Sequence, residues 1–156
     1  MLEKLAHLLS SHAEPADAHC DGPCGVYDPA SARIHAEAVR SMTKKILALS
    51  PPDPSDAAAT ARYLNTVSRY VAVKEQEAEH TKRDLLILWT DYFKPPHLEA
   101  HPELHDIFWK AAKLCSSCKV ELSPEHCDEL MAAVEKIHHL FWKTKGRDVP
   151  WTLAAP

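Results

Sequence analysis

The scarcity of glycine constrains this chain more than any other feature of its sequence. Only three of its 156 residues are glycine. Gly22 and Gly25 lie close together, and Gly146 lies near the C-terminus. A glycine-poor chain that is rich in Ala, Leu, Glu and Lys favours helices, whereas a pair of nearby glycines marks a backbone that needs an unusual conformation. The sequence therefore predicts a helical protein with one irregular segment near its N-terminal end.

Proline divides the rest of the chain into four helix-compatible stretches. Each stretch follows an Asp-Pro, His-Pro or Ser-Pro pair, and proline is favoured at the first helical position after an Asp or Ser N-cap. The predicted helices span about 29–49, 55–92, 102–118 and 124–145, with Pro95-Pro96 ending the second and Gly146 capping the fourth. Since the connections are short, the predicted fold class is all-α, an antiparallel four-helix bundle.

One apolar face of each predicted helix is expected to form the core, because apolar residues recur there at steps of three and four. In the first two helices these residues are Ile34, Ala38, Met42, Ile46 and Leu49, and then Leu64, Val67, Val71, Ala78, Leu85, Leu88, Trp89 and Tyr92. In the last two they are Leu104, Ile107, Phe108, Ala111, Cys115 and Cys118, and then Cys127, Leu130, Met131, Val134, Ile137 and Phe141.

Charge and hydropathy exclude two classes of partner. The net charge is −4 and no basic cluster recurs, so nucleic acid is not an expected partner. No apolar run reaches the length of a membrane span, so no membrane is expected either. The five cysteines are an odd number, which favours metal ligation or redox chemistry in a reducing compartment over a disulfide framework. A cytoplasmic location is predicted.

Residues 1–18 look separate from the rest. They contain Lys4 and a few leucines, as a signal peptide would, but the apolar part spans only residues 5–9 and includes His7. That run is too short to be the hydrophobic region of a secretory signal peptide. Two interpretations stay open on spacing alone: a short amphipathic first helix, or a cytoplasmic leader that is cut off.

The segment HCDGPCGVYDP, residues 19–29, carries the candidate chemistry. Cys20 and Cys24 stand four apart around a Gly-Pro turn, so both thiolates can reach one ion, although C-x3-C is not the usual zinc spacing. If the chain began at His19, its free amine and the amide nitrogen of Cys20 would complete a planar set of two nitrogens and two sulfurs. Such a set suits nickel(II) or copper(II), with the His19 imidazole as an axial ligand.

The same string closely resembles the N-terminal nickel hook of nickel-dependent superoxide dismutases. Further matches to that family are Lys74-Glu75-Gln76, the stretch WTDYFKPPH at 89–97 and the stretch FWKTK at 141–145. The resemblance therefore covers most of the chain after residue 18. Residues 19–28 are called the hook below.

The resemblance implies how the chain matures and assembles. A leader at 1–18 would be removed by a protease so that His19 becomes the N-terminus. The hook would precede a four-helix bundle at 29–146 and a C-terminal tail at 147–156. Members of the family assemble as homohexamers, so a homohexamer is expected.

The resemblance also implies the ligands and the reaction. Nickel would be held by the amine and imidazole of His19, the amide nitrogen and thiolate of Cys20, and the thiolate of Cys24. A cis peptide bond before Pro23 would close the hook, a form that is inexpensive only before proline. Superoxide would be disproportionated to oxygen and hydrogen peroxide as nickel cycles between Ni(II) and Ni(III).

Four further residues are expected to be catalytic by the same resemblance. Tyr27 would stand over the open face of the metal and restrict access to small anions. Tyr92 would back Tyr27, and Lys94 would help to fix the hook. Asp21, within the hook, completes this group. The competing interpretation of the two tyrosines is ordinary core packing.

Two positions depart from the family pattern. Members of the family carry Glu where this chain has His35 and Arg where it has Glu77. We predict that His35 and Glu77 replace that pair with reversed charge order and orient the axial imidazole. The alternative is that both side chains point to solvent.

Other cysteines and histidines allow rival interpretations. Cys115, Cys118 and Cys127, with His126 nearby, could form a thiol oxidoreductase or zinc site, although their helical periodicity favours core positions. The spacing of His97, His101 and His105 is typical of ligands, but the helix start between them favours surface positions. Thiol redox catalysis and nickel storage are thus the alternative functions.

Overall fold

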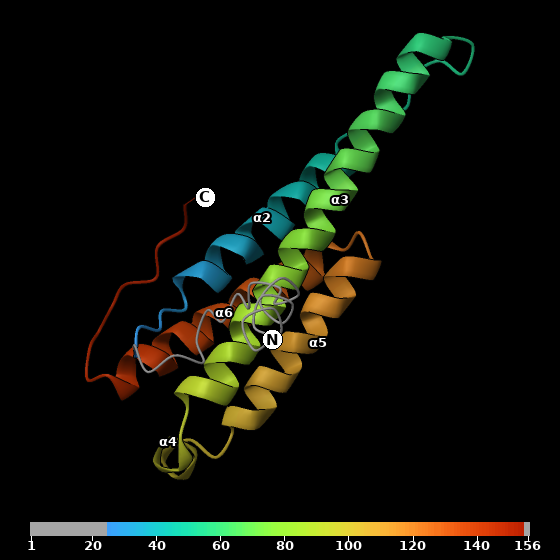
Figure 1. Ribbon diagram of the computed structural model, residues 1–156. Coiled ribbons are helices and arrows are strands. Elements are labelled where there is room, and N and C mark those ends of the chain that lie inside the picture. Colours follow the sequence, from blue (N-terminus) through green and yellow to red (C-terminus); the bar gives the residue numbers. More distant parts are fainter. Residues whose placement is uncertain (1–24, 155–156) are drawn as a thin grey trace, which may run out of the picture.

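The computed structural model describes residues 25–154, and every regular element among them is helical (Figure 1). The predictions for residues 1–24, which include most of the hook, lie outside these described residues. None of the described helices combines the length and the low polarity that crossing a membrane requires. The elements are α2 (Ala30–Leu47), α3 (Ala57–Ile87), a π-helical turn η1 (Leu88–Tyr92), α4 (Pro95–Ala100), α5 (Leu104–Val120) and α6 (Pro124–Thr144).

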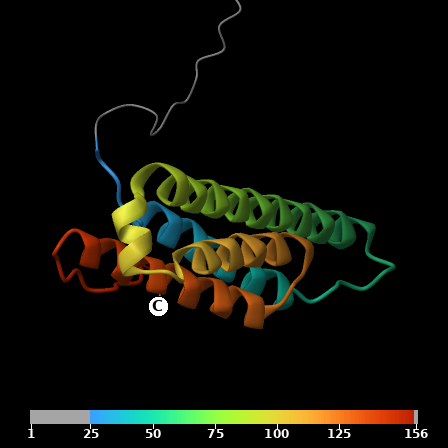
Figure 2. The same cartoon turned by 90° about the horizontal axis from the view of Figure 1, so that it is seen from below.

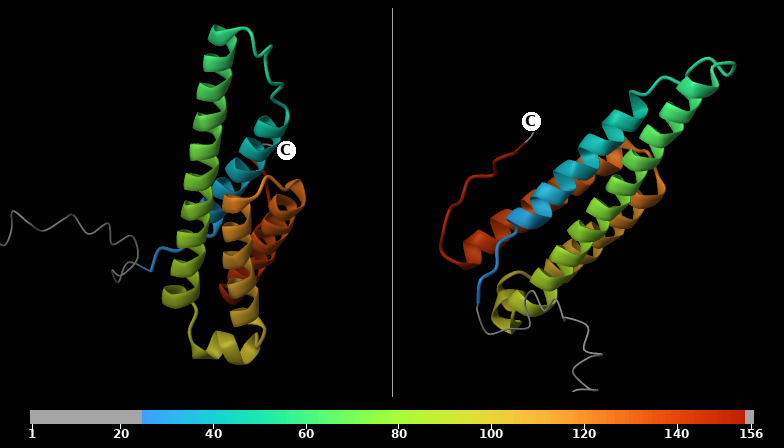
Figure 3. Two further views of the ribbon diagram at one scale, coloured as in Figure 1. Left: turned by 90° about the vertical axis from the view of Figure 1, so that its right-hand side faces the viewer. Right: turned by 45° about the horizontal axis from the view of Figure 1, so that its top comes forward.

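The four long helices form the predicted bundle (Figure 2). Contacts join α2 to α3, α3 to α5, α5 to α6 and α6 back to α2, so each helix packs against two neighbours. The predicted fold class, an all-α four-helix bundle, is therefore confirmed. The helix α3 is the longest, and its N-terminal half extends past the ends of the other helices (Figures 1 and 3).

The core predicted for the last two helices is confirmed. Every residue assigned to it in α5 and α6 is buried. The predicted face of the first helix is only partly right: Ile46 is buried as predicted, but Ile34 is 51% exposed, and Ala32, Ala36 and Thr43, which were not assigned to that face, are buried. Small side chains allow two helices to approach closely. Small residues therefore lie at the helix contact here, where the periodicity rule predicted larger apolar ones. The contact face of α2 is therefore rotated from the predicted one.

The predicted inner face of the second helix is wrong in its first half. Leu64 is 56% exposed because this part of α3 lies beyond the bundle (Figure 3). Further along, Ala78, Leu85 and Leu88 are buried as predicted. An amphipathic pattern shows which face is apolar, but it does not show where the neighbouring helices end.

The junction between the second and third predicted helices is more structured than expected. The final turn of the second helix is π-helical, ending at Tyr92. Pro95-Pro96 was predicted only to end that helix, but Pro95 also begins the short helix α4. Proline lacks an N–H group and is pre-set for the first helical turn, so one proline pair performs both functions. The third helix consequently begins at Leu104 rather than at 102.

Capping fixes both ends of α6 as predicted. Ser123 Oγ accepts a hydrogen bond from the amide of His126 at 3.1 Å. At the other end Gly146 has a φ of 65°, and its amide donates to the Lys143 carbonyl at 3.0 Å. The amide of Arg147 donates to Trp142 at 2.9 Å, which completes a Schellman motif. A side chain at position 146 would be strained by this positive φ.

The C-terminal tail has no helix or strand in residues 147–154, yet it packs on the bundle. The ring of Trp151 lies 5.3 Å from that of His138, centroid to centroid, and His138 Nε2 lies 2.8 Å from the Val149 carbonyl oxygen. The amide of Ala154 donates to Glu37 at 2.8 Å. The tail therefore connects α6 to α2.

A buried lysine ties α3 to the end of α5. Lys74 is 2% exposed. Its ammonium donates to the carbonyl oxygens of Cys118 at 2.6 Å, Lys119 at 2.7 Å and Glu121 at 3.1 Å. Burial lowers the pKa of Lys74, but three carbonyl dipoles at a helix C-terminus favour the charged form. The lysine thus satisfies carbonyl groups that the helix itself leaves without partners.

We predict that Lys74→Met lowers the free energy of unfolding by about 2–4 kcal/mol, because the carbonyls at the end of α5 lose a charged donor. Urea unfolding monitored by circular dichroism measures the change. Lys110→Met is the matched control, since Lys110 is an exposed lysine on α5 that forms a surface ion pair with Asp106. Equal effects of the two substitutions would contradict the role assigned to Lys74.

Candidate metal centre

The predicted ligands and part of the predicted catalytic set lie outside the described residues. These are His19, Cys20, Asp21, Pro23 and Cys24. The description begins at Gly25, whose φ of 65° is the left-handed conformation expected of a glycine in this irregular segment. What the structure describes is therefore the part that follows the predicted ligands: residues 25–28 and the helices they meet, called the wall below.

Two of the predicted catalytic residues lie side by side. The rings of Tyr27 and Tyr92 have centroids 5.5 Å apart, although 65 positions separate them in the sequence. The hydroxyl groups of Tyr92 and Thr144 are 2.6 Å apart, and Lys145 Nζ lies 5.1 Å from the Tyr92 ring centroid. The C-terminal end of α6 thus holds Tyr92, and Tyr92 in turn supports Tyr27. Thr144 and Lys145 were not identified as site residues from the sequence.

Aromatic packing fixes Tyr92 further. Its ring stacks on His97 at 5.5 Å and contacts Phe141 at 4.5 Å, centroid to centroid. The Nδ1 atom of His97 accepts a hydrogen bond from the backbone amide of Lys94 at 3.1 Å. The predicted catalytic residue Lys94 is exposed at the start of α4 and is not part of the aromatic cluster.

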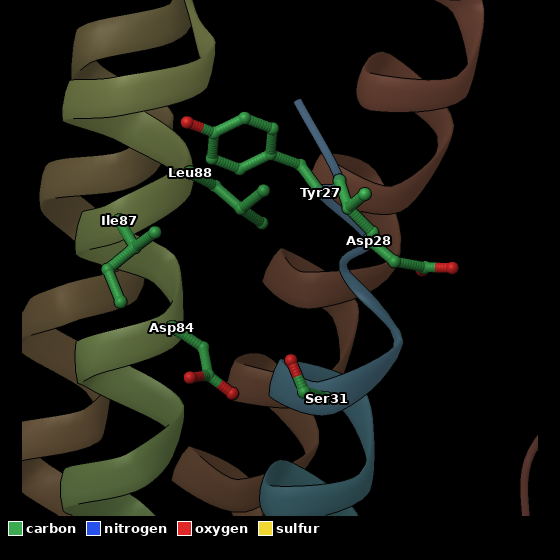
Figure 4. Close-up of a pocket in the computed structure, with 7 residues that line it drawn as sticks. Tyr27, Asp28, Ser31, Asp84, Ile87 and Leu88 are labelled. Atoms are coloured by element: carbon green, nitrogen blue, oxygen red, sulfur yellow. The ribbon is translucent and has the colours of Figure 1, made fainter. Parts of the chain in front are cut away.

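A small pocket opens where the chain enters α2 (Figure 4). Tyr27 forms one wall, and Asp84 of α3 and Ser31 of α2 extend into the space between the two helices. Asp28 Oδ1 accepts a hydrogen bond from the amide of Ala30 at 2.8 Å, which fixes the entry of the chain into α2. The lining residues are Val26, Tyr27, Asp28, Ser31, Asp84, Ile87 and Leu88. The pocket therefore directly adjoins the end of the hook.

The two residues that depart from the family pattern are in contact. His35 Nδ1 of α2 lies 2.5 Å from Glu77 Oε2 of α3. Their side chains are 28% and 22% exposed, so they do not simply point to solvent. Two groups that sequence reasoning missed lie beside them: the His80 ring, 5.0 Å from the His35 ring, and Asp84 Oδ2, 3.8 Å from His35 Nε2. The three-residue spacing of Glu77 and His80, which places them on one face of a helix, was the sequence signal that could have identified His80.

The three remaining cysteines are core residues. Cys115, Cys118 and Cys127 are at most 1% exposed. Burial raises the pKa of Cys115 to about 12. Cys118 Sγ lies 4.0 Å from Cys127 Sγ, and Cys127 Sγ lies 3.4 Å from the Thr43 hydroxyl. The hydrogen bond from Cys118 lowers the pKa of Cys127 and raises that of Cys118. This environment excludes solvent and favours packing over catalysis.

The three histidines of ligand-like spacing have separate partners. His97 stacks on Tyr92, and His101 lies 3.8 Å from Glu103. His105 is exposed and its Nδ1 accepts a hydrogen bond from Trp89 at 2.8 Å. His97 and His101 are partly buried, so the predicted surface position holds fully only for His105.

Comparison with known proteins agrees with the resemblance seen in the hook. The family model described as nickel-containing superoxide dismutase matches residues 14–145. The chain is 41% identical over 128 residues to superoxide dismutase [Ni] of Streptomyces seoulensis, covering 82% of this chain and 88% of the relative. It is 39% identical to the protein of the same name from Streptomyces coelicolor, with the same coverage.

Solved structures give the same result. The structure aligns with that of a nickel-containing superoxide dismutase whose nickel ligation corresponds to the oxidised state, with a TM-score of 0.71 and 41% identity. The alignment covers 83% of this chain and all of that one. This chain therefore resembles these proteins both in sequence and in the arrangement of its helices.

We predict that the buried thiols are nearly inert in the folded protein. In a Cys20→Ser/Cys24→Ser variant, only Cys115, Cys118 and Cys127 remain to react with iodoacetamide. With a pKa of about 12, Cys115 has a thiolate fraction at pH 8 that is roughly a thousandfold lower than that of an ordinary cysteine. Burial protects Cys118 and Cys127 from the reagent. Mass spectrometry should find all three alkylated only after unfolding in guanidinium. Fast labelling of the native variant would instead favour the thiol oxidoreductase interpretation.

Proposed function

Because this chain belongs to the nickel-containing superoxide dismutase family, we propose that it binds nickel in the hook and disproportionates superoxide there. The chain is an oxidoreductase with nickel as its cofactor and superoxide as its substrate. The observation that carries the proposal is the extent of the family match, which includes the hook and the bundle that supports it in one alignment.

The donor set of the hook fits nickel. Cys20 and Cys24 supply two soft thiolates, and His19 with the amide of Cys20 supplies nitrogen ligands. This mixed set of nitrogen and sulfur is unsuited to hard ions such as Mg²⁺ or Ca²⁺. Nickel, when bound, supplies the one-electron exchange by which one superoxide is oxidised to oxygen and a second, with two protons, is reduced to hydrogen peroxide.

The residues of the wall shape access to that centre. Tyr27 lies three residues after Cys24 and is held by Tyr92, so a rigid aromatic pair borders the hook. Such a wall favours a diatomic anion over larger molecules. The Lys145 ammonium lies 5.1 Å from the Tyr92 ring centroid, and Lys94 is exposed at the start of α4, so both cations would favour the approach of anionic superoxide.

The remaining parts of the proposal follow the family. A protease removes residues 1–18, which frees the amine of His19. The mature chain assembles as a homohexamer and works in the cytoplasm. His35 and Glu77, in contact across α2 and α3, would orient the imidazole of His19 in place of the Glu and Arg of other members.

The unprocessed chain is predicted to be inactive. Until residues 1–18 are removed, the nitrogen of His19 belongs to a peptide bond, and a peptide nitrogen is a poor ligand unless it is deprotonated. Dismutase activity should therefore appear only in protein whose N-terminus is His19 by mass spectrometry. Full activity in a sample verified to begin at Met1 would refute this requirement.

The thiolates of the hook are predicted to be essential. Cys20→Ser and Cys24→Ser should each lose both nickel and dismutase activity, because a hydroxyl is a hard and weakly basic ligand. Nickel per chain is measured by elemental analysis of the processed protein, with about one ion expected in the unsubstituted chain.

The matched control replaces the buried thiols. A variant with Ala at Cys115, Cys118 and Cys127 should keep its nickel and its activity but unfold at lower denaturant, because each substitution removes core volume. If that variant is folded and nickel-loaded yet inactive, the buried cysteines take part in catalysis and the proposal is wrong about them.

His35 and Glu77 are predicted to act as a unit. His35→Ala and Glu77→Ala should each lower the activity by about 10- to 100-fold while nickel stays bound, as is typical when a group that supports a metal ligand is removed. The double variant should lose much less than the product of the two effects, because either substitution already breaks the contact. Independent effects that multiply, or no effect on activity, would show that a group other than this pair orients the His19 imidazole.

A further inference from the structure

One cluster outside the hook has the composition of a metal site. Among the described residues, the side chains that bring at least three candidate ligand atoms within 4.8 Å of one another are His35, Glu77 and His80. His35 comes from α2, whereas Glu77 and His80 stand three apart on α3 and so share one face. Two rigid helices therefore position the three groups.

A fourth group beside the cluster lacks a partner. Asp84 lies one helical turn after His80 on α3. Its Oδ2 atom is buried and makes no hydrogen bond within the described part of the chain, although it lies 3.8 Å from His35 Nε2. A buried carboxylate oxygen without a donor is costly, and a cation is one group that would satisfy it.

We propose that His35, Glu77 and His80 form a binding site for a zinc-class divalent cation, with water in the fourth position. Two imidazoles and one carboxylate are a ligand set that Zn²⁺ commonly takes, and the nearby Asp84 carboxylate adds a second negative charge beside His35. Tetrahedral ligand atoms about Zn²⁺ lie roughly 3.3 Å apart, as bond lengths near 2.0–2.1 Å require. The side chains reach that arrangement by small rotations from the 2.5–4.8 Å separations seen here.

The cation and the hydrogen bond use the same atoms. Glu77 and His35 hold each other at 2.5 Å when no ion is bound, and an ion on Glu77 takes the place of the shared proton. The pair therefore either orients the hook or binds the cation. The test for zinc is done with a variant whose hook lacks both thiolates, so its outcome is separate from the function proposed for the hook.

Isothermal titration with zinc chloride tests the site in the full-length Cys20→Ser/Cys24→Ser variant, whose hook lacks both thiolates. We expect one zinc ion per chain at this site, and at least about tenfold weaker binding when His80→Ala is added. Adding Glu77→Gln, which keeps the side chain's shape, should weaken binding in the same way. Because the two imidazoles select against hard cations, excess Mg²⁺ should not compete.

The control is His139→Ala in the same background. His139 is an exposed histidine on α6, 3.9 Å from Glu135, and among the described residues this pair is not part of a group of three candidate ligands. It should leave zinc affinity unchanged. Equal zinc affinity in the His80→Ala and His139→Ala proteins, absence of zinc binding, or competition by Mg²⁺ would each overturn the proposal.

Discussion

The close packing of α2 against α3 is the constraint on which the site depends. Ala32 and Ala36 of α2 and Ala78 of α3 are at most 1% exposed, so small side chains make up part of the buried surface of both helices. Two helices that meet through small residues have their backbones close together, and polar side chains at the border of the interface can then reach across. His35 and Glu77 do so. Larger residues on these faces would separate the helices and break that contact.

The sequence predicted most of the fold because its signals were local. Proline before each helix, Ser123 as an N-cap and Gly146 as a C-cap act within a few residues, and α6 was placed almost to the residue. The face of α2 was mispredicted because the periodicity rule ranks residues by hydrophobicity, whereas this interface selects for small size. The short helix α4 was missed because a proline pair ends one helix and begins another by the same physical property.

The candidate site was predictable only where its residues are close in sequence or match a known string. The hook was recognised from eleven consecutive residues, and Tyr27 and Tyr92 were named by resemblance. Thr144 and Lys145 lie in the matched stretch 141–145, but their contact with Tyr92 could not be found in this way, because the end of α6 meets Tyr92 only after the bundle has formed. His80 is intermediate: its spacing from Glu77 is visible in the sequence, but its proximity to His35 depends on the packing of α2 against α3.

The placement of the five cysteines suits an enzyme whose product is an oxidant. Hydrogen peroxide attacks thiolates rather than thiols, so a cysteine is protected by metal ligation, by a raised pKa or by exclusion of solvent. Cys20 and Cys24 are the proposed nickel ligands, whereas burial raises the pKa of Cys115 to about 12. The hydrogen bond with Cys118 lowers the pKa of Cys127, which leaves burial as its protection. Tight packing between α5 and α6 therefore preserves Cys127 chemically as well as stabilising the bundle.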